Sequence, residues 1–286
     1  MMVGTRFAPR LVPARPDLAA EHLRGRVEAE RFVPGTRRSV ATPLLDLSLS
    51  PEPGAGRDTQ LLYGETFTVY EIGEDGLAWG QAELDGYVGY VSAADLTAPR
   101  PRGTRVTALW SHLYPVADVR AKPTQELPFL AEVPVAGTTA GFARLRGGGH
   151  VPRPHLFPIR GDFVDQAARF LGAPYLWGGR SVAGLDCSAL VQLALLATGA
   201  PAPRDSDMQA SLLGRALAEE EPGRRGDLVF WRGHVGILED ADTLLHANGY
   251  HMAVAREPLG AAIDRIAAQG GGPVTGRRRL EPGAPE

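Results

Sequence analysis

Leu185-Asp186-Cys187-Ser188-Ala189-Leu190-Val191 places the only cysteine of this 286-residue chain directly before an apolar run. Apolar residues continue to Leu196 and Gly199 follows, so the pattern predicts a buried helix that begins near Cys187. Asp186 is a suitable N-cap residue. In the first turn of a helix, free N–H groups and the helix dipole favour a thiolate and can stabilise an oxyanion. A single thiol forms neither an internal disulfide nor a cysteine-rich zinc site, so Cys187 is either an inert buried thiol or a nucleophile.

Two histidines downstream favour the nucleophile. His234 begins one predicted strand, residues 234–238, and His246 lies in a second, residues 243–247, with a polar turn between them. A hairpin centred near position 240 would put the two residues directly opposite one another, with Cβ atoms roughly 5 Å apart. One imidazole would then act as the base for Cys187 while the other orients it. The alternative is that both are half-buried sheet residues, and their shared register favours the catalytic interpretation.

The motifs around these residues resemble those of the NlpC-type bacterial cell-wall cysteine peptidases, whose fold is a reduced papain-like one. The resemblance covers about residues 160–260 and rests on segments that occur in the family's order. They are Pro174-Tyr175-Leu176-Trp177-Gly178-Gly179, then Asp186-Cys187-Ser188, then Arg204-Asp205-Ser206 with Gln209, then Gly226-Asp227-Leu228-Val229-Phe230 with His234-Val235-Gly236-Ile237. The resemblance implies that Cys187 is the nucleophile, His234 the base and His246 the third, orienting residue. Ala189 departs from the family, which commonly has glycine there, and we expect little effect from the extra methyl group.

Composition excludes several other classes of protein. The net charge is −3 and the sequence pI is near 6.2, so no basic excess points to nucleic acid or to an anionic membrane surface. No segment approaches the ~18 apolar residues of a membrane span, and the N-terminal residues lack the apolar core of a signal peptide. A lone reduced cysteine also fits a reducing compartment, so we predict a cytoplasmic protein. No phosphate-binding loop, dinucleotide fingerprint or metal-ligand cluster is present in the sequence, and we expect neither cofactor nor metal.

The length of the chain allows several domains, and we predict an α+β protein in which small β-barrels precede a papain-like domain. Short strands at even spacing are typical of small barrels. The segment Gly86-Tyr87-Val88-Gly89-Tyr90 resembles a strand of the bacterial SH3-like barrel. The N-terminal arm is expected to contain one helix near Asp17–Glu30. The predicted parts are the arm (1–36), SH3-like barrel 1 (37–100), a diverged SH3-like barrel 2 (101–158) and the NlpC-type papain-like domain (159–286).

An NlpC-type domain behind such barrels resembles the branch of the family that cuts free stem peptides. The resemblance implies cleavage of the γ-D-Glu–diamino acid bond in small peptidoglycan-derived peptides with an unblocked N-terminal L-Ala, and release of L-Ala-γ-D-Glu for recycling. It also implies acidic and tyrosine groups of the first barrel that hold the α-ammonium, and Glu65 and Tyr87 are the candidates. Alternatively, Glu65 is a solvated turn residue and Tyr87 a core residue of the barrel. Asp186 and Ser188 beside the nucleophile, and Trp177 in the glycine-rich loop, are further candidates for substrate binding.

Three rival functions stay open at this stage. An amidase or acyltransferase of the same fold would act on lipids or small amides. A second rival is a peptidoglycan hydrolase that acts on the intact wall. A third is a non-catalytic wall-binding or scaffold protein that uses only its barrels, against which the intact set of Cys187, His234 and His246 argues.

Overall fold

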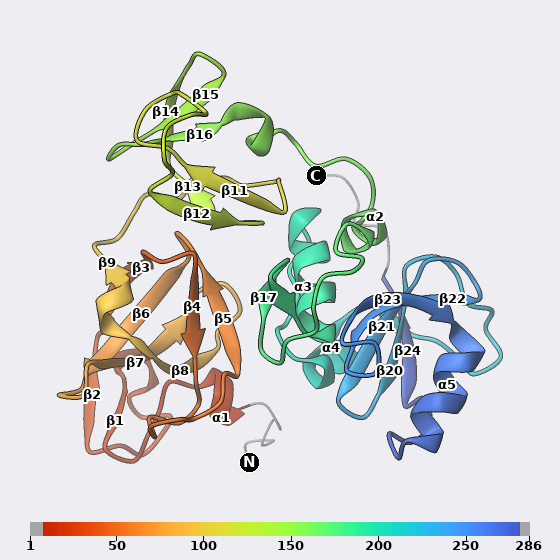
Figure 1. Ribbon diagram of the computed structural model, residues 1–286. Helices are drawn as coiled ribbons and strands as arrows, with labels where there is room; N and C mark the ends of the chain where they lie inside the picture. The colour runs from red at the N-terminus through yellow and green to blue at the C-terminus, as the bar shows by residue number, and fades with distance from the viewer. Residues whose placement is uncertain (1–7, 281–286) are drawn as a thin grey trace. The chain divides into compact units, whose positions relative to one another are not determined.

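The computed structural model describes residues 8–280 and consists mainly of short strands with a few helices (Figure 1). The chain divides into two compact units, one ending at Phe157 and the other beginning at Pro158. The second unit therefore begins one residue before Ile159, where the sequence predicted the last domain to begin. Within residues 8–280, no helix is both long enough and apolar enough to cross a membrane.

The first unit contains the predicted SH3-like barrel. Alternating burial explains its longest strand, in which Phe67 and Val69 point into the core while their neighbours are more exposed. An antiparallel five-stranded sheet runs in the order β8-β7-β6-β3-β9, and a bridge between Ser48 and Tyr90 connects it to the β4-β5 hairpin. The strands are β3 (Thr36–Val40), β4 (Leu44–Leu47), β5 (Thr59–Leu62), β6 (Thr66–Ile72), β7 (Leu77–Ala82), β8 (Val88–Ser92) and β9 (Leu96–Thr97).

The helix predicted near Asp17–Glu30 is wrong. Leu18 is instead part of a short strand and is fully buried against Trp79 and Val88 of the barrel. Contacts of this kind outweigh the weak helix propensity of the segment, and Gly25, with a φ of 77°, turns the chain back. The arm therefore packs as a parallel strand pair. Its elements are α1 (Ala8–Leu11), β1 (Leu18–Ala20), a 3₁₀ turn (Glu21–Leu23) and β2 (Arg31–Val33).

The rest of the first unit is a second all-β region with its own core. Tyr63 of the first barrel packs into this core beside Val106, Val133 and Leu145. The main chain of Tyr63 also accepts a hydrogen bond from the N–H of Glu132 at 2.9 Å, so the two β regions are joined within the unit. The strands are β10 (Thr104–Arg105), β11 (Trp110–Leu113), β12 (Gln125–Pro128), β13 (Glu132–Val133), β14 (Val135–Thr139), β15 (Phe142–Leu145) and β16 (His150–Pro152).

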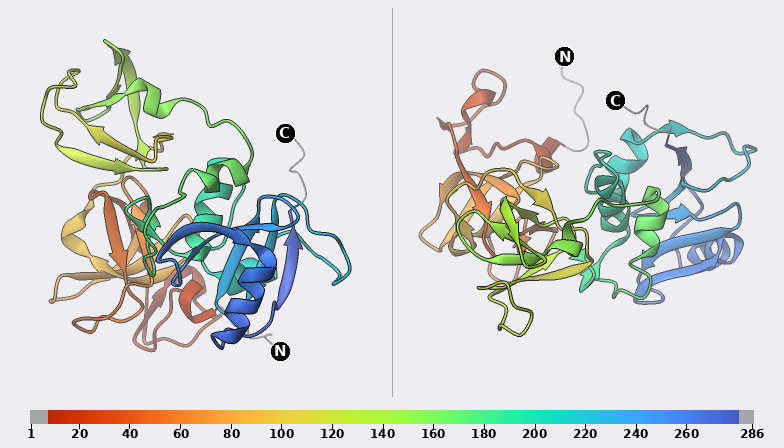
Figure 2. Two further views of the ribbon diagram at one scale, coloured as in Figure 1. Left: turned by 45° about the vertical axis from the view of Figure 1, so that its right-hand side comes forward. Right: turned by 90° about the horizontal axis from the view of Figure 1, so that it is seen from above.

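The second unit is built on an antiparallel six-stranded sheet in the order β19-β24-β20-β21-β22-β23. Helix α5 packs on one face through Ile263 and Ile266, which meet Trp231, Leu238 and Leu244. Helix α3 lies on the other side of the sheet (Figures 1 and 2). The strands are β17 (Arg180–Ser181), β18 (Gly184–Leu185), β19 (Arg215–Ala216), β20 (Asp227–Trp231), β21 (His234–Leu238), β22 (Thr243–Asn248), β23 (Ala253–Pro258) and β24 (Gly276–Arg279), and the helices are α2 (Phe163–Ala168), α3 (Cys187–Ala197), α4 (Ser206–Leu212) and α5 (Leu259–Ala268).

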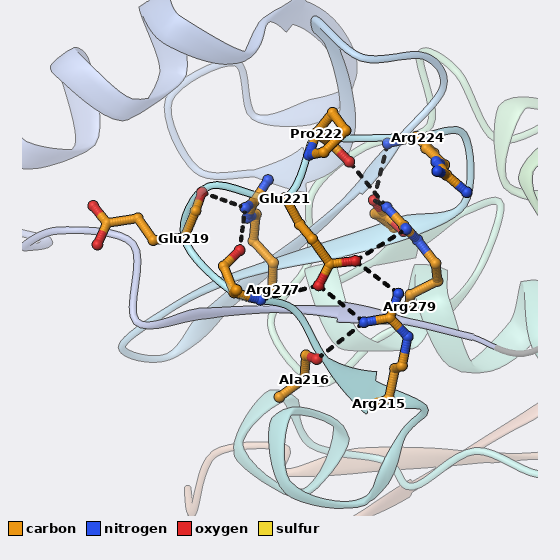
Figure 3. Close-up of polar contacts among 10 residues, drawn as sticks. Arg215, Ala216, Glu219, Glu221, Pro222, Arg224, Arg277 and Arg279 are labelled. Carbon is orange, nitrogen blue, oxygen red and sulfur yellow. Dashed lines mark hydrogen bonds and ion pairs between the residues drawn. The ribbon is translucent and has the colours of Figure 1, made fainter.

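A cluster of arginines holds β24 in this sheet (Figure 3). Arg279 of β24 makes two hydrogen bonds of 2.7 Å to the carboxylate of Asp227, which is fully buried. Arg277 donates to two main-chain carbonyls of the loop before β20, and Arg215 pairs with Glu221 in the same loop. These contacts anchor β24 beside β20, the strand that leads to the site described next.

Candidate active site

Cys187 is the first residue of α3, as the sequence predicted. Asp186 is the N-cap, and its Oδ1 accepts a hydrogen bond of 2.8 Å from the N–H of Ala189. The apolar run buries the helix over its first ten residues, and Cys187 itself is only 6% exposed. The nucleophile candidate therefore sits at a helix start that the cap and the core fix in place.

Asp186 and Ser188 are held by a buried arginine. Arg204 is 1% exposed, and its two terminal nitrogens lie 2.9 and 2.7 Å from the two carboxylate oxygens of Asp186. The hydroxyl of Ser188 donates to Asp186 at 3.1 Å and accepts from Arg204 at 2.9 Å, and the N–H of Gly178 donates to Asp186 at 2.9 Å. Each contact aligns the loop around the thiol, so both residues have an internal structural role; their predicted contact with substrate stays a prediction.

The glycine-rich loop brings a tyrosine to the thiol, which the sequence interpretation missed. The N–H of Tyr175 donates to the carbonyl of Met252 at 2.9 Å, which fixes the loop against the sheet. Burial is the main cause that raises the pKa of Tyr175 well above its usual range, and the nearby Cys187 is the second. The phenol therefore stays protonated and is available as a hydrogen-bond donor. Trp177 of the same loop is 66% exposed.

The predicted direct pairing of the two histidines is wrong by two residues. Ile237 pairs with Leu245, and the same register continued places Gly236, not His234, opposite His246. The imidazoles nevertheless meet diagonally, with Nε2 of His234 2.8 Å from Nδ1 of His246. A Cβ atom on Gly236 would lie 3.3 Å from the Cβ of His246. The glycine thus leaves the space that lets His246 lean towards His234.

A carboxylate that the sequence interpretation also missed extends this pair. On the other side of β22, His246 pairs with Ala255, and Glu257 is again the diagonal neighbour. Oε1 of Glu257 lies 2.7 Å from Nε2 of His246, and the guanidinium of Arg265 in α5 contacts the same oxygen. His234, His246 and Glu257 therefore form a continuous hydrogen-bonded series, which we call the relay.

Burial sets the charges in the relay. Burial is the main cause that lowers the pKa of His234 and of His246, so both imidazoles are neutral near pH 7. Burial also acts to raise the pKa of Glu257, but Arg265 and His246 outweigh it and hold that pKa below its usual range. An ionised Glu257 accepts a hydrogen bond from the Nε2–H of His246, and Nδ1 of His246 in turn accepts one from the Nε2–H of His234. This assignment leaves Nδ1 of His234 as a free acceptor.

The thiol itself is protonated at rest, which corrects the prediction of a thiolate. The pKa of Cys187 is raised to about 12. Burial is the main cause, and the carboxylate of Asp186 is the second. Hydrogen bonding from the main chain of Val235 acts in the opposite direction but is weaker. That contact also places the thiol beside the residue that directly follows His234. A neutral thiol therefore lies next to the start of β21, which carries the neutral imidazole of His234.

One group of side chains near the relay has the composition of a metal site. Ligand atoms of His246, His251 and Glu257 lie within 4.8 Å of one another. Both ring nitrogens of His246 already have hydrogen-bond partners. Oε1 of Glu257, the oxygen that faces His246, also accepts a hydrogen bond from Arg265. Two of the three candidate ligands, His246 and Oε1 of Glu257, are thus already engaged in the relay.

The two candidates in the first unit are both buried. Glu65 is 8% exposed and follows the turn after β5, where its Oε2 accepts a hydrogen bond of 3.0 Å from the N–H of Leu62. It is therefore a turn residue but not a solvated one. Tyr87 is 3% exposed, which agrees with a core position in the barrel. Binding of an ammonium group by either residue stays a prediction.

Comparison with known families agrees with both domain types. Residues 172–264 match the NlpC/P60 family, and residues 47–96 match the bacterial dipeptidyl-peptidase SH3 domain. The chain is 28% identical over 219 residues to a gamma-D-glutamyl-L-lysine dipeptidyl-peptidase of Bacillus subtilis, a match that covers 66% of this chain and 71% of the relative. It is 29% identical over 168 residues to dipeptidyl-peptidase 6 of Lysinibacillus sphaericus, which covers 56% of this chain and 59% of the relative.

A solved structure shows the same fold over most of the chain. An NlpC/P60 family protein from Bacillus cereus superposes with a TM-score of 0.71 at 20% sequence identity, covering 86% of this chain and all of that one. The predicted papain-like domain and the SH3-like domain before it are confirmed.

Proposed function

Since the chain carries an NlpC/P60 domain behind a bacterial dipeptidyl-peptidase SH3 domain, we propose that it is a cysteine peptidase of peptidoglycan stem peptides. Relatives named as gamma-D-glutamyl-L-lysine dipeptidyl-peptidase and dipeptidyl-peptidase 6 support a finer assignment. In it, the enzyme hydrolyses the γ-D-Glu–diamino acid bond of free stem peptides and releases L-Ala-γ-D-Glu. The observation that carries the proposal is a thiol at a helix start beside the strand that bears His234, the first member of the relay.

The first half of the reaction uses the free nitrogen of the relay. Nδ1 of His234 takes the proton of the Cys187 thiol as Sγ attacks the γ-carbonyl carbon of D-Glu. His246 and Glu257 stabilise the imidazolium that forms, because each accepts a hydrogen bond from the preceding member. The main-chain N–H of Cys187 and the protonated phenol of Tyr175 are donors for the oxyanion.

The second half returns the enzyme to its resting state. The His234 imidazolium gives its proton to the amine of the diamino acid, which leaves, and a thioester on Cys187 remains. His234 then removes a proton from a water molecule that attacks the thioester carbonyl. The thiolate regains a proton as L-Ala-γ-D-Glu is released. Each proton transfer in these steps has His234 or Cys187 as donor or acceptor.

A matched pair of substrates tests the proposal. One is L-Ala-γ-D-Glu-meso-diaminopimelate with a free N-terminal amine, and the other is its N-acetylated form. We expect mass spectrometry to show release of L-Ala-γ-D-Glu from the free form alone, and no release by Cys187→Ala, which should remain folded. Cleavage of both forms, or digestion of purified sacculi, would instead assign the enzyme to the intact wall. Turnover by Cys187→Ala would overturn the mechanism.

Recognition of the free amine is a separate step of the proposal. We propose Glu65 and Tyr87 as groups that bind the α-ammonium, because a buried carboxylate favours a cation over a neutral acetylated amine. Glu65→Gln should then raise KM for the free peptide and reduce the discrimination against its acetylated form. Unchanged discrimination would remove Glu65 from the binding site. Action on free peptides alone follows only if this discrimination is found.

A further inference from the structure

The turn that follows β22 contacts the glycine-rich loop at Tyr175. Main-chain hydrogen bonds of 2.9 Å first join Gly172 and Ala173, just before this loop, to Val254 in β23. The N–H of Tyr175 then donates to the carbonyl of Met252, which lies between the two strands, in the turn of residues 249–252. Because Tyr175 itself makes this bond, the position of its main chain depends on how the turn is folded.

The turn holds Met252 in a backbone conformation that residues other than glycine rarely adopt. Its φ is 50°, in the left-handed region. Met252 is also 60% exposed, so packing of its side chain does not account for the conformation. Backbone strain of this kind persists only where the surrounding structure holds the chain in place. The strained residue is the one whose carbonyl meets the N–H of Tyr175.

Asn248 provides the side-chain contacts that hold this turn. It is the last residue of β22, two positions after His246, and is only 5% exposed. Its Oδ1 accepts a hydrogen bond of 2.8 Å from the main-chain N–H of His251 and lies 3.0 Å from Nδ1 of the same residue. A main-chain N–H is always a donor, so this contact identifies the oxygen of the amide. Asparagine side chains commonly fold turns by bonding to the main chain nearby.

The turn also reaches the relay, which offers a second route from Asn248 to the chemistry. The ring centre of Tyr250 lies 4.3 Å from the guanidinium of Arg265, which contacts Glu257. Nδ2 of Asn248 lies 3.4 Å from the carbonyl of His246, a longer contact than those of Oδ1. The short contacts of Asn248 thus lead to the residue beside Met252 and favour the route to the tyrosine.

We propose that Asn248 is a positioning residue for Tyr175: it folds the turn so that the carbonyl of Met252 holds the main chain of the tyrosine. The phenol is thereby kept where it donates to the oxyanion. This role rests on the proposed function, in which Tyr175 is an oxyanion donor. On its other side the loop is bound to Leu185, whose carbonyl accepts from the N–H of Leu176 at 3.1 Å. The turn therefore supplies one of two main-chain attachments beside the phenol.

Amide hydrogen exchange of the full chain, followed by NMR, tests the contact without any turnover. We expect Asn248→Ala to speed exchange of the Tyr175 N–H roughly tenfold or more, because the turn opens more often. Asn248→Asp keeps the acceptor oxygen and should restore much of the protection. The N–H of Leu176, bound to Leu185, is the internal reference and should not change. Unchanged exchange at Tyr175, or equal acceleration at both amides, would overturn the proposal.

A double-mutant cycle on kcat tests the route by which Asn248 acts. Tyr175→Phe removes the donor and should lower kcat roughly a hundredfold, and Asn248→Ala should lower it roughly tenfold with little change in KM. If Asn248 acts through the tyrosine, Asn248→Ala lowers kcat no further in the Tyr175→Phe enzyme. Combined with Glu257→Gln, the two losses should multiply. The reverse pattern would assign Asn248 to the relay, and wild-type kcat in Tyr175→Phe would also overturn the proposal.

Two variants of Met252 test the same step if Asn248→Ala fails to fold. A β-branched residue is poorly tolerated at positive φ, whereas glycine adopts it readily, so Met252→Val should lose more kcat than Met252→Gly. Ala140 has a φ of 45° in an exposed turn of the first unit. Ala140→Val therefore adds comparable strain elsewhere and should keep the kcat of the wild type. Equal kcat in the two Met252 variants would overturn the proposal.

The exchange experiment separates this inference from the proposed function. If the wild type cleaves no stem peptide while Asn248→Ala still releases the Tyr175 amide alone, the function is wrong and the structural role of the turn stands. If the wild type cleaves the peptide and the amide is unaffected by Asn248→Ala, the function stands and the positioning role is wrong.

Discussion

His246 donates to Glu257 and accepts from His234, although neither residue is its direct partner across the sheet. The positions directly opposite His246 are Gly236 and Ala255, the two smallest residue types. Small neighbours on both sides leave the imidazole free to reach two diagonal residues at once. The relay thus depends on how the three adjacent strands β21, β22 and β23 are aligned.

Glu257→Gln tests whether the relay needs its terminal charge. Without the carboxylate, His246 loses the acceptor that fixes its tautomer, and His234 loses support for its imidazolium form. We expect kcat to fall roughly tenfold or more with little change in KM. Glu239→Gln is the matched control, because Glu239 pairs with Arg256 away from the histidines. Equal kcat values for the two variants would assign Glu257 to stability alone.

Gly236→Ala tests the space beside His246. A Cβ atom there would lie 2.6 Å from Cδ1 of Leu244 and 3.3 Å from the Cβ of His246, so both side chains must shift. We expect a lower kcat and a loss of stability of about 1–3 kcal/mol, typical of overpacking. Gly276→Ala in β24 is the control, because its Cβ would meet nothing within 4 Å. Wild-type kcat in a stable Gly236→Ala protein would contradict the geometric role of the glycine.

The sequence predicted the nucleophile helix and both histidines because those features are local. A capping aspartate, an apolar run and a histidine at a strand start are visible without any tertiary contact. The centre of the hairpin between β21 and β22 was missed by one residue, which shifts the cross-strand pairing by two, since the composition of a polar turn does not fix which of its residues is central.

Other site residues depend on contacts that a linear pattern does not contain. Glu257 follows Arg256 in a strand of alternating exposure and looks like a solvent-facing charge until β23 is placed beside β22. The failed helix prediction near Leu18 has the same origin, because burial against Trp79 decides its conformation. Burial also reversed the expected charge of Cys187, since a helix start favours a thiolate only where the group is not desolvated.

Alkylation tests the protonation state of Cys187 directly, because the chain has no other thiol. Burial and Asp186 raise the pKa to about 12, so the thiol form dominates below that pH and only the thiolate fraction reacts. In the absence of substrate, the rate with iodoacetamide should keep rising from pH 7 to pH 10. The urea-unfolded chain should level off near the ordinary cysteine pKa of roughly 8.5. A plateau below pH 8 in the folded protein would show a thiolate at rest.

Arg279→Gln tests the buried ion pair that anchors the last strand. The buried carboxylate of Asp227 would lose the guanidinium that binds both of its oxygens. Leaving a buried carboxylate without its partner is strongly destabilising, whereas an exposed pair contributes little to stability. Arg256→Gln removes an exposed pair with Glu239 and has the same change in net charge, so it is the control.

Urea unfolding of both variants decides between structural and catalytic roles for this cluster. We expect the free energy of unfolding to fall clearly more for Arg279→Gln than for Arg256→Gln, with kcat of the folded protein unchanged in both. Adding Asp227→Asn to Arg279→Gln should recover part of the loss, because it removes the unpaired buried charge. Equal stability of the two single variants would mean that β20 and β24 are held together by their main-chain pairing alone.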